Sequence, residues 1–329
     1  MNILVTGGAG YIGSHVVEEL QKRGFTPIVY DNLSTGHENA VPEDVQLIEG
    51  DIHDVRFATH IMEQFKIDAV IHFAASSLVG ESMTNPSKYY FNNVEGSLHL
   101  LEAMKNAGVD RIVFSSTAAV YGEPEQVPIK EDSKLQPTNV YGRTKLVIEG
   151  MLKDYDMAYD FRYVALRYFN AAGASPTRDI GEDHNPESHL IPLILKTAQG
   201  VRKQVAIFGT DYPTEDGTCI RDYIHVCDLA KAHVLALQHL LKGGESRVYN
   251  LGSESGFSVR QMMDCAKEVT GVDFPVVEEK RRAGDPAVLI ASSEKIRREL
   301  GWVPQESDVR NVIATAWRWH KNHPNGYGA

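Results

Sequence analysis

Tyr141 and Lys145 are the side chains whose types and spacing first suggest chemistry. They are four residues apart in a stretch with helical periodicity, which places a phenol and an amine about 6 Å apart along one face of a helix. A free tyrosine, with a pKa of about 10, becomes a base at neutral pH only where positive charge stabilises its phenolate. A lysine ammonium supplies such charge, so the pair predicts acid–base chemistry. The same spacing also occurs where a tyrosine packs and a lysine is solvated.

A run of hydroxyl groups precedes this pair. Ser115, Ser116 and Thr117 fall where a strand is expected to end, and doubly wound sheets bind their ligands at that end. We expect Thr117 to hydrogen-bond a reacting hydroxyl and to share its proton with the phenol of Tyr141. Ser115 and Ser116 could equally do no more than end the strand.

A glycine-rich loop follows the first predicted strand. Gly7, Gly10 and Gly13 are three residues apart and lead into a helix. The first glycine permits a tight turn, the second lets the backbone approach a pyrophosphate, and the third allows the helix to pack closely on the strand. The amide groups and positive dipole end of the helix then face the phosphates. The loop predicts a dinucleotide site.

Two acidic residues refine the identity of this dinucleotide. Asp31 ends the second predicted strand, where a carboxylate accepts hydrogen bonds from the adenosine ribose and repels a 2′-phosphate. This favours NAD over NADP. Asp51 and Ile52 follow the third strand and resemble the pair that flanks the adenine, although Asp51 could also belong to a solvated turn.

The elements that position these residues alternate between short apolar strands and longer helices. Gly24 and Gly108 stand where glycine caps end helices. Such alternation requires a parallel sheet covered on both faces, so we predict an α/β doubly wound (Rossmann) fold. The predicted strands are Ile3–Thr6, Pro27–Asp31, Val45–Glu49, Ala69–Phe73, Arg111–Ser115 and Tyr163–Arg167, and the predicted helices are Ile12–Arg23, Asp54–Phe65, Pro86–Ala107 and Asn139–Tyr155.

The alternation stops after about Asn170, where glycine, proline and polar residues become frequent. We predict an NAD-binding domain over residues 1–170 and a second, smaller, loop-rich α/β substrate domain over 171–329. A helix at His225–Leu241 and a strand at Val248–Leu251 suggest that residues 222–251 rejoin the first domain. The tail Asn322–Ala329 is expected to fray.

Composition narrows the class of protein. The 329 residues suit two domains, and no apolar run approaches the roughly 20 residues of a membrane span. A net charge of −11 opposes binding to nucleic acid. Three cysteines without a CxxC pair, and a first strand that begins without a signal peptide, predict a cytoplasmic protein.

Several motifs together carry a resemblance that covers nearly the whole chain. They are TGGAGYIGSH at 6–15, DNLSTG at 31–36, HFAA at 72–75, SSTAAVYG at 115–122, YGRTK at 141–145, RYFNAAGA at 167–174, GTCIRDYIHV at 217–226 and RRAGDPA at 281–287. On these residues the chain resembles the extended short-chain dehydrogenase/reductases and, among them, the UDP-glucose 4-epimerase family.

The resemblance implies roles for individual residues. It makes Thr117, Tyr141 and Lys145 catalytic and implies no metal. The residues implied to line NAD, besides the three glycines, Tyr141 and Lys145, are Tyr11, Ile12, Asp31, Asn32, Asp51, Ile52, Phe73, Ala74, Asn92 and Phe169. Those implied to hold UDP, with arginines on the pyrophosphate and an acid on a ribose, are Asn170, His189, Leu190, Ala206, Phe208, Arg221, Arg282 and Asp285. Taken singly, Phe208 could be core, His189 a surface loop residue, and the two arginines solvated charges.

The activity implied by the resemblance is the reversible inversion of C4 in UDP-galactose and UDP-glucose, in galactose metabolism. The reaction passes through a 4-keto sugar, and NAD is restored in each cycle. The resemblance also implies a homodimer paired through the helices near Pro86–Ala107 and Asn139–Tyr155. Three positions bear on this expectation. Thr117 replaces a common serine, Ser77 stands where a lysine often meets the NAD pyrophosphate, and Leu289 leaves room for N-acetyl hexosamines.

Two other functions compete with this one. A nucleotide-sugar 4,6-dehydratase or decarboxylase would use the same oxidation but needs acid or base groups just after Thr117, where this chain has Ala118 and Ala119. A non-catalytic NAD-binding module could keep the fold without the chemistry. The presence of Thr117, Tyr141 and Lys145 argues against the second.

Overall fold

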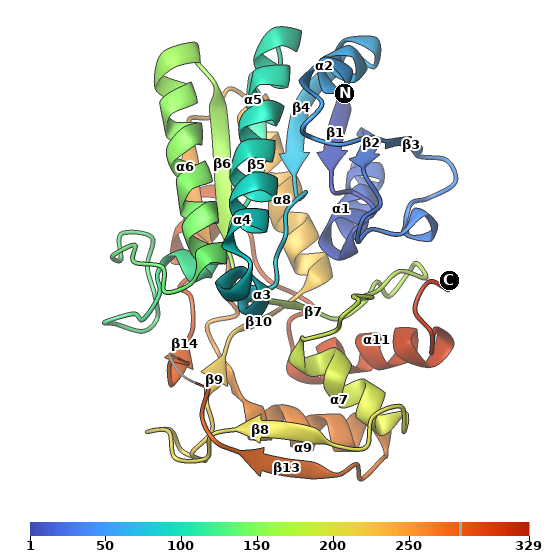
Figure 1. Cartoon of the computed structure of the whole chain (residues 1–329), viewed down its shortest axis with the longest axis vertical. Helices are drawn as coiled ribbons and strands as arrows, with labels where there is room; N and C mark the ends of the chain where they lie inside the picture. The colour runs from blue at the N-terminus through green and yellow to red at the C-terminus, as the bar shows by residue number, and fades with distance from the viewer. Residues whose placement is uncertain (283–284, 329) are drawn as a thin grey trace.

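The computed structural model describes residues 1–282 and 285–328. Its central element is a seven-stranded sheet with the order β11-β6-β5-β4-β1-β2-β3, in which every neighbouring pair is parallel (Figure 1). The predicted doubly wound fold is confirmed. The strands are β1 (Asn2–Thr6), β2 (Thr26–Asp31), β3 (Gln46–Glu49), β4 (Ile67–His72), β5 (Arg111–Ser115), β6 (Arg162–Arg167) and β11 (Arg247–Asn250).

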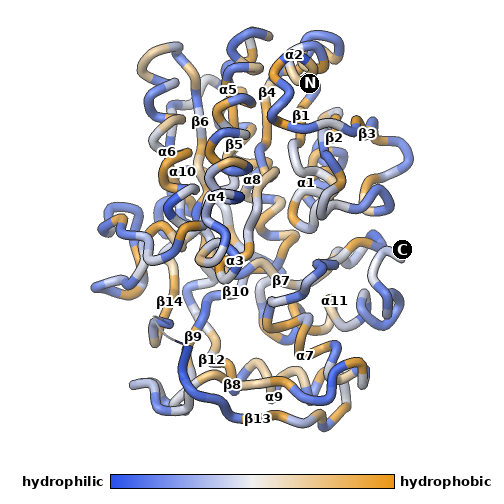
Figure 2. Tube along the Cα trace, in the orientation of Figure 1, coloured by the Kyte–Doolittle hydropathy of each residue, from blue (hydrophilic) through white to orange (hydrophobic). Residues whose placement is uncertain are grey.

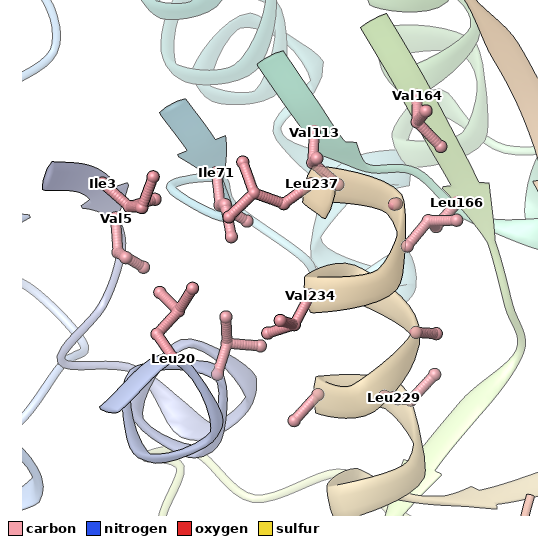
Figure 3. Packing of buried hydrophobic residues seen from close by; sticks show 14 of the residues in the cluster. Ile3, Val5, Leu20, Ile71, Val113, Val164, Leu166, Leu229, Val234 and Leu237 are labelled. Carbon is pink, nitrogen blue, oxygen red and sulfur yellow. The ribbon is translucent and has the colours of Figure 1, made fainter. Parts of the chain in front are cut away.

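Helices cover both faces of the sheet, as parallel connections require. On one face α1 (Tyr11–Lys22) packs beside α8 (Val226–Leu241), and Leu20, Val234 and Leu237 meet the apolar side chains of the strands (Figure 3). On the other face lie α2 (Val55–Gln64), α5 (Gly96–Ala107) and α6 (Val140–Tyr159). Glycines in the left-handed conformation follow α1 and α5 at positions 24 and 108, as predicted.

The helix predicted over Pro86–Ala107 is not uniform. It consists of α4 (Pro86–Tyr89), a π-helical segment η2 (Tyr90–Glu95) and α5, preceded by the short α3 (Val79–Thr84). A π-helical turn adds a residue and so rotates the side chains that follow it, an irregularity that apolar spacing does not reveal. The other predicted strands and helices agree with the structure to within a few residues at their ends.

A smaller unit lies beneath the carboxyl ends of the sheet strands (Figure 1). Its own core is formed mainly by α7, α9 and α11, with side chains such as Leu195, Met262 and Ile313. Figure 2 shows hydrophilic residues along much of the outer loops. The elements are α7 (Leu190–Ala198), α9 (Val259–Thr270) and α11 (Val309–Asn322), with the short strands β7 (Asn170–Ala172), β8 (Val205–Phe208), β9 (Ile220–Arg221), β10 (Tyr223–His225), β12 (Phe257–Ser258), β13 (Val276–Glu279) and β14 (Val288–Leu289). Helix α10 (Glu294–Leu300) packs instead beside β11 and α8, where its Ile296 joins the core of the large sheet.

The chain returns to the large sheet after residue 225. Helix α8 supplies Leu229 and Leu237 to the core beside α1, and β11 pairs with β6 at the edge of the sheet. The C-terminal segment was expected to fray, but hydrogen bonds anchor its Tyr327. Its backbone N–H donates to Asp183 Oδ2 at 3.0 Å, and its hydroxyl accepts from the backbone N–H of Gly181 at 3.1 Å. Residue 329 lies outside the described residues.

No helix within residues 1–282 and 285–328 has the length and apolar character needed to cross a membrane.

Candidate active site

A cleft of about 1440 Å³ opens at the carboxyl ends of the strands and reaches into the smaller unit. Eighteen of the residues with predicted roles line it, which brings the cofactor, catalytic and part of the substrate set together. They are Gly7, Gly10, Tyr11, Ile12, Gly13, Asp31, Asn32, Ile52, Phe73, Ala74, Asn92, Thr117, Tyr141, Lys145, Phe169, Asn170, His189 and Arg221.

The glycine loop has no space for side chains at its first and third glycines. Gly7 has a φ of +73°, and a Cβ there would lie 2.6 Å from the backbone nitrogen of Ala74. A Cβ on Gly13 would lie 2.2 Å from the carbonyl oxygen of Gly7. These contacts hold the first turn of α1 against the ends of β1 and β4, with Gly10 at the helix N-terminus. The bare loop below a helix N-terminus fits a dinucleotide pyrophosphate.

The carboxylate of Asp31 is fixed at the edge of this loop. Its Oδ2 accepts from the backbone N–H of Ala9 at 3.0 Å, and its Oδ1 accepts from that of Leu33 at 2.9 Å. Burial raises the pKa of Asp31, while the two amide groups act in the opposite direction. A buried acceptor with only backbone donors around it fits the hydroxyl groups of an adenosine ribose.

Asp51 lies beside the cleft but does not line it. Its Oδ2 accepts from the side-chain amide of Asn32 at 3.0 Å, and its Oδ1 lies 2.6 Å from Nδ1 of His53. These bonds outweigh partial burial and lower the pKa of Asp51. Asp51 thus holds Asn32, which does line the cleft, while neighbouring Ile52 reaches the cleft itself.

The π-helical segment η2 brings Asn92 to the cleft wall. The Asn92 amide donates to the Ser76 hydroxyl at 3.1 Å. The adjacent Asn93 is fully buried and joins three elements, because its Oδ1 accepts from the backbone N–H of Ser76 at 2.8 Å and its amide donates to Thr144 of α6 at 3.1 Å. Sequence analysis missed Asn93. Its position next to Asn92 was the only indication available.

Thr117, Tyr141 and Lys145 meet at the centre of the cleft. The hydroxyl of Thr117 lies near the phenol of Tyr141 and accepts from the backbone N–H of Ala119 at 3.1 Å. The ammonium of Lys145 donates to the carbonyl oxygen of Ser115 at 3.0 Å and lies 6.0 Å from the centre of the Tyr141 ring. A phenol, a hydroxyl and an amine therefore face the same space.

Burial acts on the two titratable members of this group in opposite directions. It raises the pKa of Tyr141 to about 12, against the smaller lowering effect of the nearby Thr117 hydroxyl. It lowers the pKa of Lys145 to about 7. Both shifts favour the neutral form, since a buried site disfavours charge of either sign. The protein alone therefore does not produce the phenolate, and a further positive charge in the cleft is needed.

The start of α6 carries Tyr141 to Thr117. Asn139 caps the helix by accepting from the backbone N–H of Gly142 at 2.8 Å. A Cβ on Gly142 would lie 2.7 Å from the carbonyl oxygen of Ala119, so the helix touches the turn that bears Thr117. The positive end of the helix dipole also lies near Tyr141 and favours its ionised form.

Ser115 and Ser116 have structural partners. The Ser115 hydroxyl lies 2.5 Å from the hydroxyl of Tyr168, and that of Ser116 donates to Glu149 Oε1 at 2.5 Å. Glu149 is also bonded by the buried guanidinium of Arg167. These contacts hold the end of β5 under Thr117, which agrees with the structural interpretation of the two serines.

The predicted UDP residues fall into two groups. Asn170, His189 and Arg221 line the cleft, and the amide of Asn170 donates to the carbonyl oxygen of Asp222 at 2.9 Å. The others do not line the cleft, but three of them make specific contacts. Asp285 pairs with Arg221, and the guanidinium of Arg282 lies 4.0 Å from the centre of the Phe208 ring. The residues outside the cleft lining are Leu190, Ala206, Phe208, Arg282 and Asp285.

Four titratable residues gather on the cleft wall beside the cofactor loop. They are Glu182, His184, Glu187 and His189, of which sequence analysis singled out only His189. The nearby carboxylates of the two glutamates outweigh burial, so the pKa of His184 rises to about 9 and that of His189 to about 10. The alternation of glutamate and histidine from 182 to 189 was the signal available in the sequence.

Comparison with known proteins identifies the family. A model of the NAD dependent epimerase/dehydratase family matches residues 3–252, so the chain belongs to this family. A UDP-glucose 4-epimerase of Halalkalibacterium halodurans is 56% identical over 327 residues, which cover 99% of this chain and 98% of that protein.

Solved structures agree with this relationship. A crystal structure of a UDP-glucose 4-epimerase is 52% identical, with a TM-score of 0.98 and 100% of both chains covered. Another, from Brucella ovis in complex with NAD, is 48% identical, with a TM-score of 0.94, and covers 96% of this chain and 97% of that one. The cofactor of the family is NAD, and the glycine loop and Asp31 of this chain fit it.

Proposed function

We propose that the protein catalyses the reversible, NAD-dependent inversion of C4 in UDP-galactose and UDP-glucose. The observation that carries the proposal is the convergence of Thr117, Tyr141 and Lys145 in one cleft with the glycine loop. The relatives that cover this chain nearly end to end bear the name of this activity.

The residues of the chain manage the proton of the reaction. NAD, when bound, supplies the reversible two-electron oxidation of the substrate carbon and a positive charge in the cleft. The Tyr141 phenolate accepts the proton of the 4-hydroxyl, becomes a phenol and later returns the proton, and Thr117 holds the same hydroxyl by a hydrogen bond. The ammonium of Lys145 stabilises the phenolate when it forms and holds ribose hydroxyls of the cofactor. The sugar passes through a 4-keto form.

Inversion requires a firmly held nucleotide and a weakly held sugar. The sugar must present its other face before its C4 is reduced again, and a cleft of about 1440 Å³ leaves room for this rotation. We assign Asn170, His189 and Arg221 to the UDP moiety within the cleft. We assign the Phe208–Arg282 and Arg221–Asp285 pairs to its base, pyrophosphate and ribose, with Leu190 and Ala206 beside them.

Dehydration is disfavoured by the residues after Thr117. Ala119 lines the cleft and Ala118 is buried, and neither can transfer a proton. A 4-keto sugar formed here therefore meets no acid or base at positions 118 and 119 that could remove its C5 proton. Reduction back at C4 is then the remaining path.

The proposal is tested by incubating the purified protein with UDP-galactose, with and without added NAD, and separating the products. We expect UDP-glucose in both cases, because an enzyme that restores its cofactor in each cycle can retain it. Absence of UDP-glucose under both conditions would contradict the function. Product only with added NAD would contradict cofactor retention alone.

A broader substrate range rests on Leu289. This residue of β14 lines the cleft and packs beside Val120 and Tyr121. Leucine is smaller than tyrosine, so we extend the proposal to UDP-N-acetyl hexosamines. Rates on UDP-N-acetylgalactosamine, measured for the wild type and Leu289→Tyr, test this, and an undetectable wild-type rate would refute it.

The organisation of the molecule is part of the proposal. We assign NAD to residues 1–170 with 222–251, and the UDP-sugar mainly to 171–329. The helical segments α3, η2, α5 and α6 pack against one another and expose apolar side chains. These exposed side chains support a homodimer. These are Val79, Met83, Tyr90, Phe91, Leu98 and Val147. Three unpaired cysteines support a cytoplasmic location.

A further inference from the structure

The loop between β7 and α7 carries two glutamates and two histidines that converge on one point. One potential ligand atom from each of Glu182, His184, Glu187 and His189 lies within 4.8 Å of all the others. The glutamate side chains are only 6% and 4% exposed, and those of the histidines 26% and 41%. Two carboxylates are thus held in a largely water-free place, where each needs a cationic partner.

The distances between these atoms match those around a tetrahedral ion. Zinc bound at 2.0–2.2 Å to nitrogen and oxygen ligands separates them from one another by roughly 3.3–3.5 Å. Glu182 Oε1 lies 3.3 Å from His184 Nδ1 and 3.1 Å from His189 Nδ1. Glu187 Oε1 lies 2.9 Å from His189 Nδ1, and Glu187 Oε2 lies 3.8 Å from His184 Nδ1. These four nitrogen–oxygen distances range from 2.9 to 3.8 Å and so lie on both sides of the separation expected around zinc.

Two atoms of the cluster are buried without a hydrogen-bond partner. These are Nδ1 of His184 and Oε2 of Glu187. Buried polar atoms in folded proteins are nearly always satisfied, so two such atoms that face the same point indicate a missing partner. A single divalent cation would satisfy both and balance the two carboxylates.

The backbone fixes one of the carboxylates in advance. Oε1 of Glu187 accepts from the backbone N–H groups of Ser188 at 2.7 Å and His189 at 2.8 Å. Hydrogen bonds of this kind orient ligands around metals. Since all four residues also line the cleft, an ion can reach them from solvent.

We propose that Glu182, His184, Glu187 and His189 bind one divalent transition-metal ion, with Zn²⁺ as the best match to two imidazoles and two carboxylates. The ion is structural. It ties the loop 182–189 to the start of α7, next to Tyr11 of the cofactor loop, whose ring packs edge-on against His184 at 6.2 Å between centres. The metal site lies in the same cleft as the proposed UDP site and shares His189 with it, but no step of the proposed reaction requires a metal.

The test uses the purified protein with its nucleotide retained, treated with a chelator and then titrated with Zn²⁺ alone by calorimetry. We expect one ion per chain with a Kd below about 10 μM, and release of protons from the imidazoles. Titration with Co²⁺ should produce the visible absorption of tetrahedral coordination, and Zn²⁺ should raise the Tm.

Two variants and one control make the test specific. His184→Ala and Glu187→Gln should each weaken Zn²⁺ binding at least about tenfold and abolish the rise in Tm. The Glu187→Gln variant keeps an oxygen for the two backbone amides, so it covers the case in which His184→Ala fails to fold. His323→Ala removes a histidine that pairs with Asp179 at 3.0 Å outside the cluster and should bind Zn²⁺ normally.

A wild-type Kd for Zn²⁺ above about 10 μM, or Zn²⁺ binding that both variants leave unchanged, would overturn the proposal. The cluster would then be two imidazolium–carboxylate pairs that need no ion. Because these measurements do not depend on turnover, they stand whether or not UDP-galactose is a substrate.

Discussion

At the residue scale, the site combines groups whose neutral forms are favoured in the protein alone. Burial holds Tyr141 as a phenol and drives Lys145 towards a free amine. The positions of Thr117, Tyr141 and Lys145 could be predicted from residue types and spacing. Their titration could not, because desolvation depends on how completely the surrounding fold encloses each group.

Replacing the proposed base tests its role directly. Tyr141→Phe keeps the ring but removes the oxygen that accepts the proton, so kcat should fall by roughly 10²–10⁴-fold. The KM for UDP-galactose and the amount of bound NAD should change little, which the assay and nucleotide extraction would measure. Near-full activity in this variant would refute the assignment, and Tyr159→Phe, at an exposed ring outside the cleft lining, serves as the control.

The buried amine of Lys145 predicts a dependence of stability on pH. Its pKa falls from 10.5 to about 7 on folding, so between these values the unfolded chain carries a proton that the folded one lacks. The contribution of Lys145 to stability therefore rises with pH above 7, by up to a few kcal/mol, while the raised pKa values of His184 and His189 act in the opposite direction. In urea unfolding of nucleotide-free protein from pH 7 to 9, the difference in stability between the wild type and Lys145→Met should therefore shift in favour of the wild type. Equal slopes for the two proteins would contradict the shift.

At the element scale, close approaches of backbone decide where the catalytic side chains stand. The start of α6 touches the turn after Thr117, and η2 inserts a π-helical turn that carries Asn92 to the cleft. Apolar spacing predicted helices in both places but could not reveal the π-helical turn. The same limit applies to the tail, whose anchoring by Tyr327 depends on Asp183 and Gly181, far away in sequence.

Two glycines of α6 provide a matched comparison. A Cβ at Gly142 would meet the carbonyl oxygen of Ala119, so Gly142→Ala should cost about 1–3 kcal/mol of stability and move Tyr141 away from Thr117. Activity should fall at least tenfold, by analogy with other misplaced catalytic groups. A Cβ at Gly150 meets nothing within 4 Å, so Gly150→Ala should stabilise by up to about 1 kcal/mol. Unfolding curves and rates measure both, and similar behaviour of the two variants would argue against this account.

At the scale of the whole molecule, the cleft is formed by segments from most of the chain. Residues from Gly7 to Gly328 line it, and the order of the strands could be anticipated because parallel crossovers follow few topologies. The pairing of Arg221 with Asp285 could not be predicted, and the alternation of glutamate and histidine from 182 to 189 does not reveal that these side chains converge. In both cases the packing of the smaller unit decides which side chains approach one another.

The proposed homodimer gives a prediction at this scale. Leu98 and Val147 are exposed apolar residues on α5 and α6, and a charge there would be buried without a partner in an interface. Leu98→Glu and Val147→Glu should therefore shift the sedimentation coefficient from a dimer to a monomer. Val303→Glu, at an exposed site outside these helices, should leave it unchanged. A wild-type monomer at micromolar concentration would refute the dimer.

The return of the chain to the large sheet has a consequence for synthesis on the ribosome. Strand β11 ends at residue 250 and completes the sheet edge beside β6. Helix α8 ends at residue 241 and covers the part of the sheet face that α1 leaves open. When the first six strands have emerged, apolar residues such as Val164 and Leu166 still lack their covering helix. The nascent chain must then carry this surface until about three quarters of the protein has been translated, which makes it a substrate for chaperones during that interval.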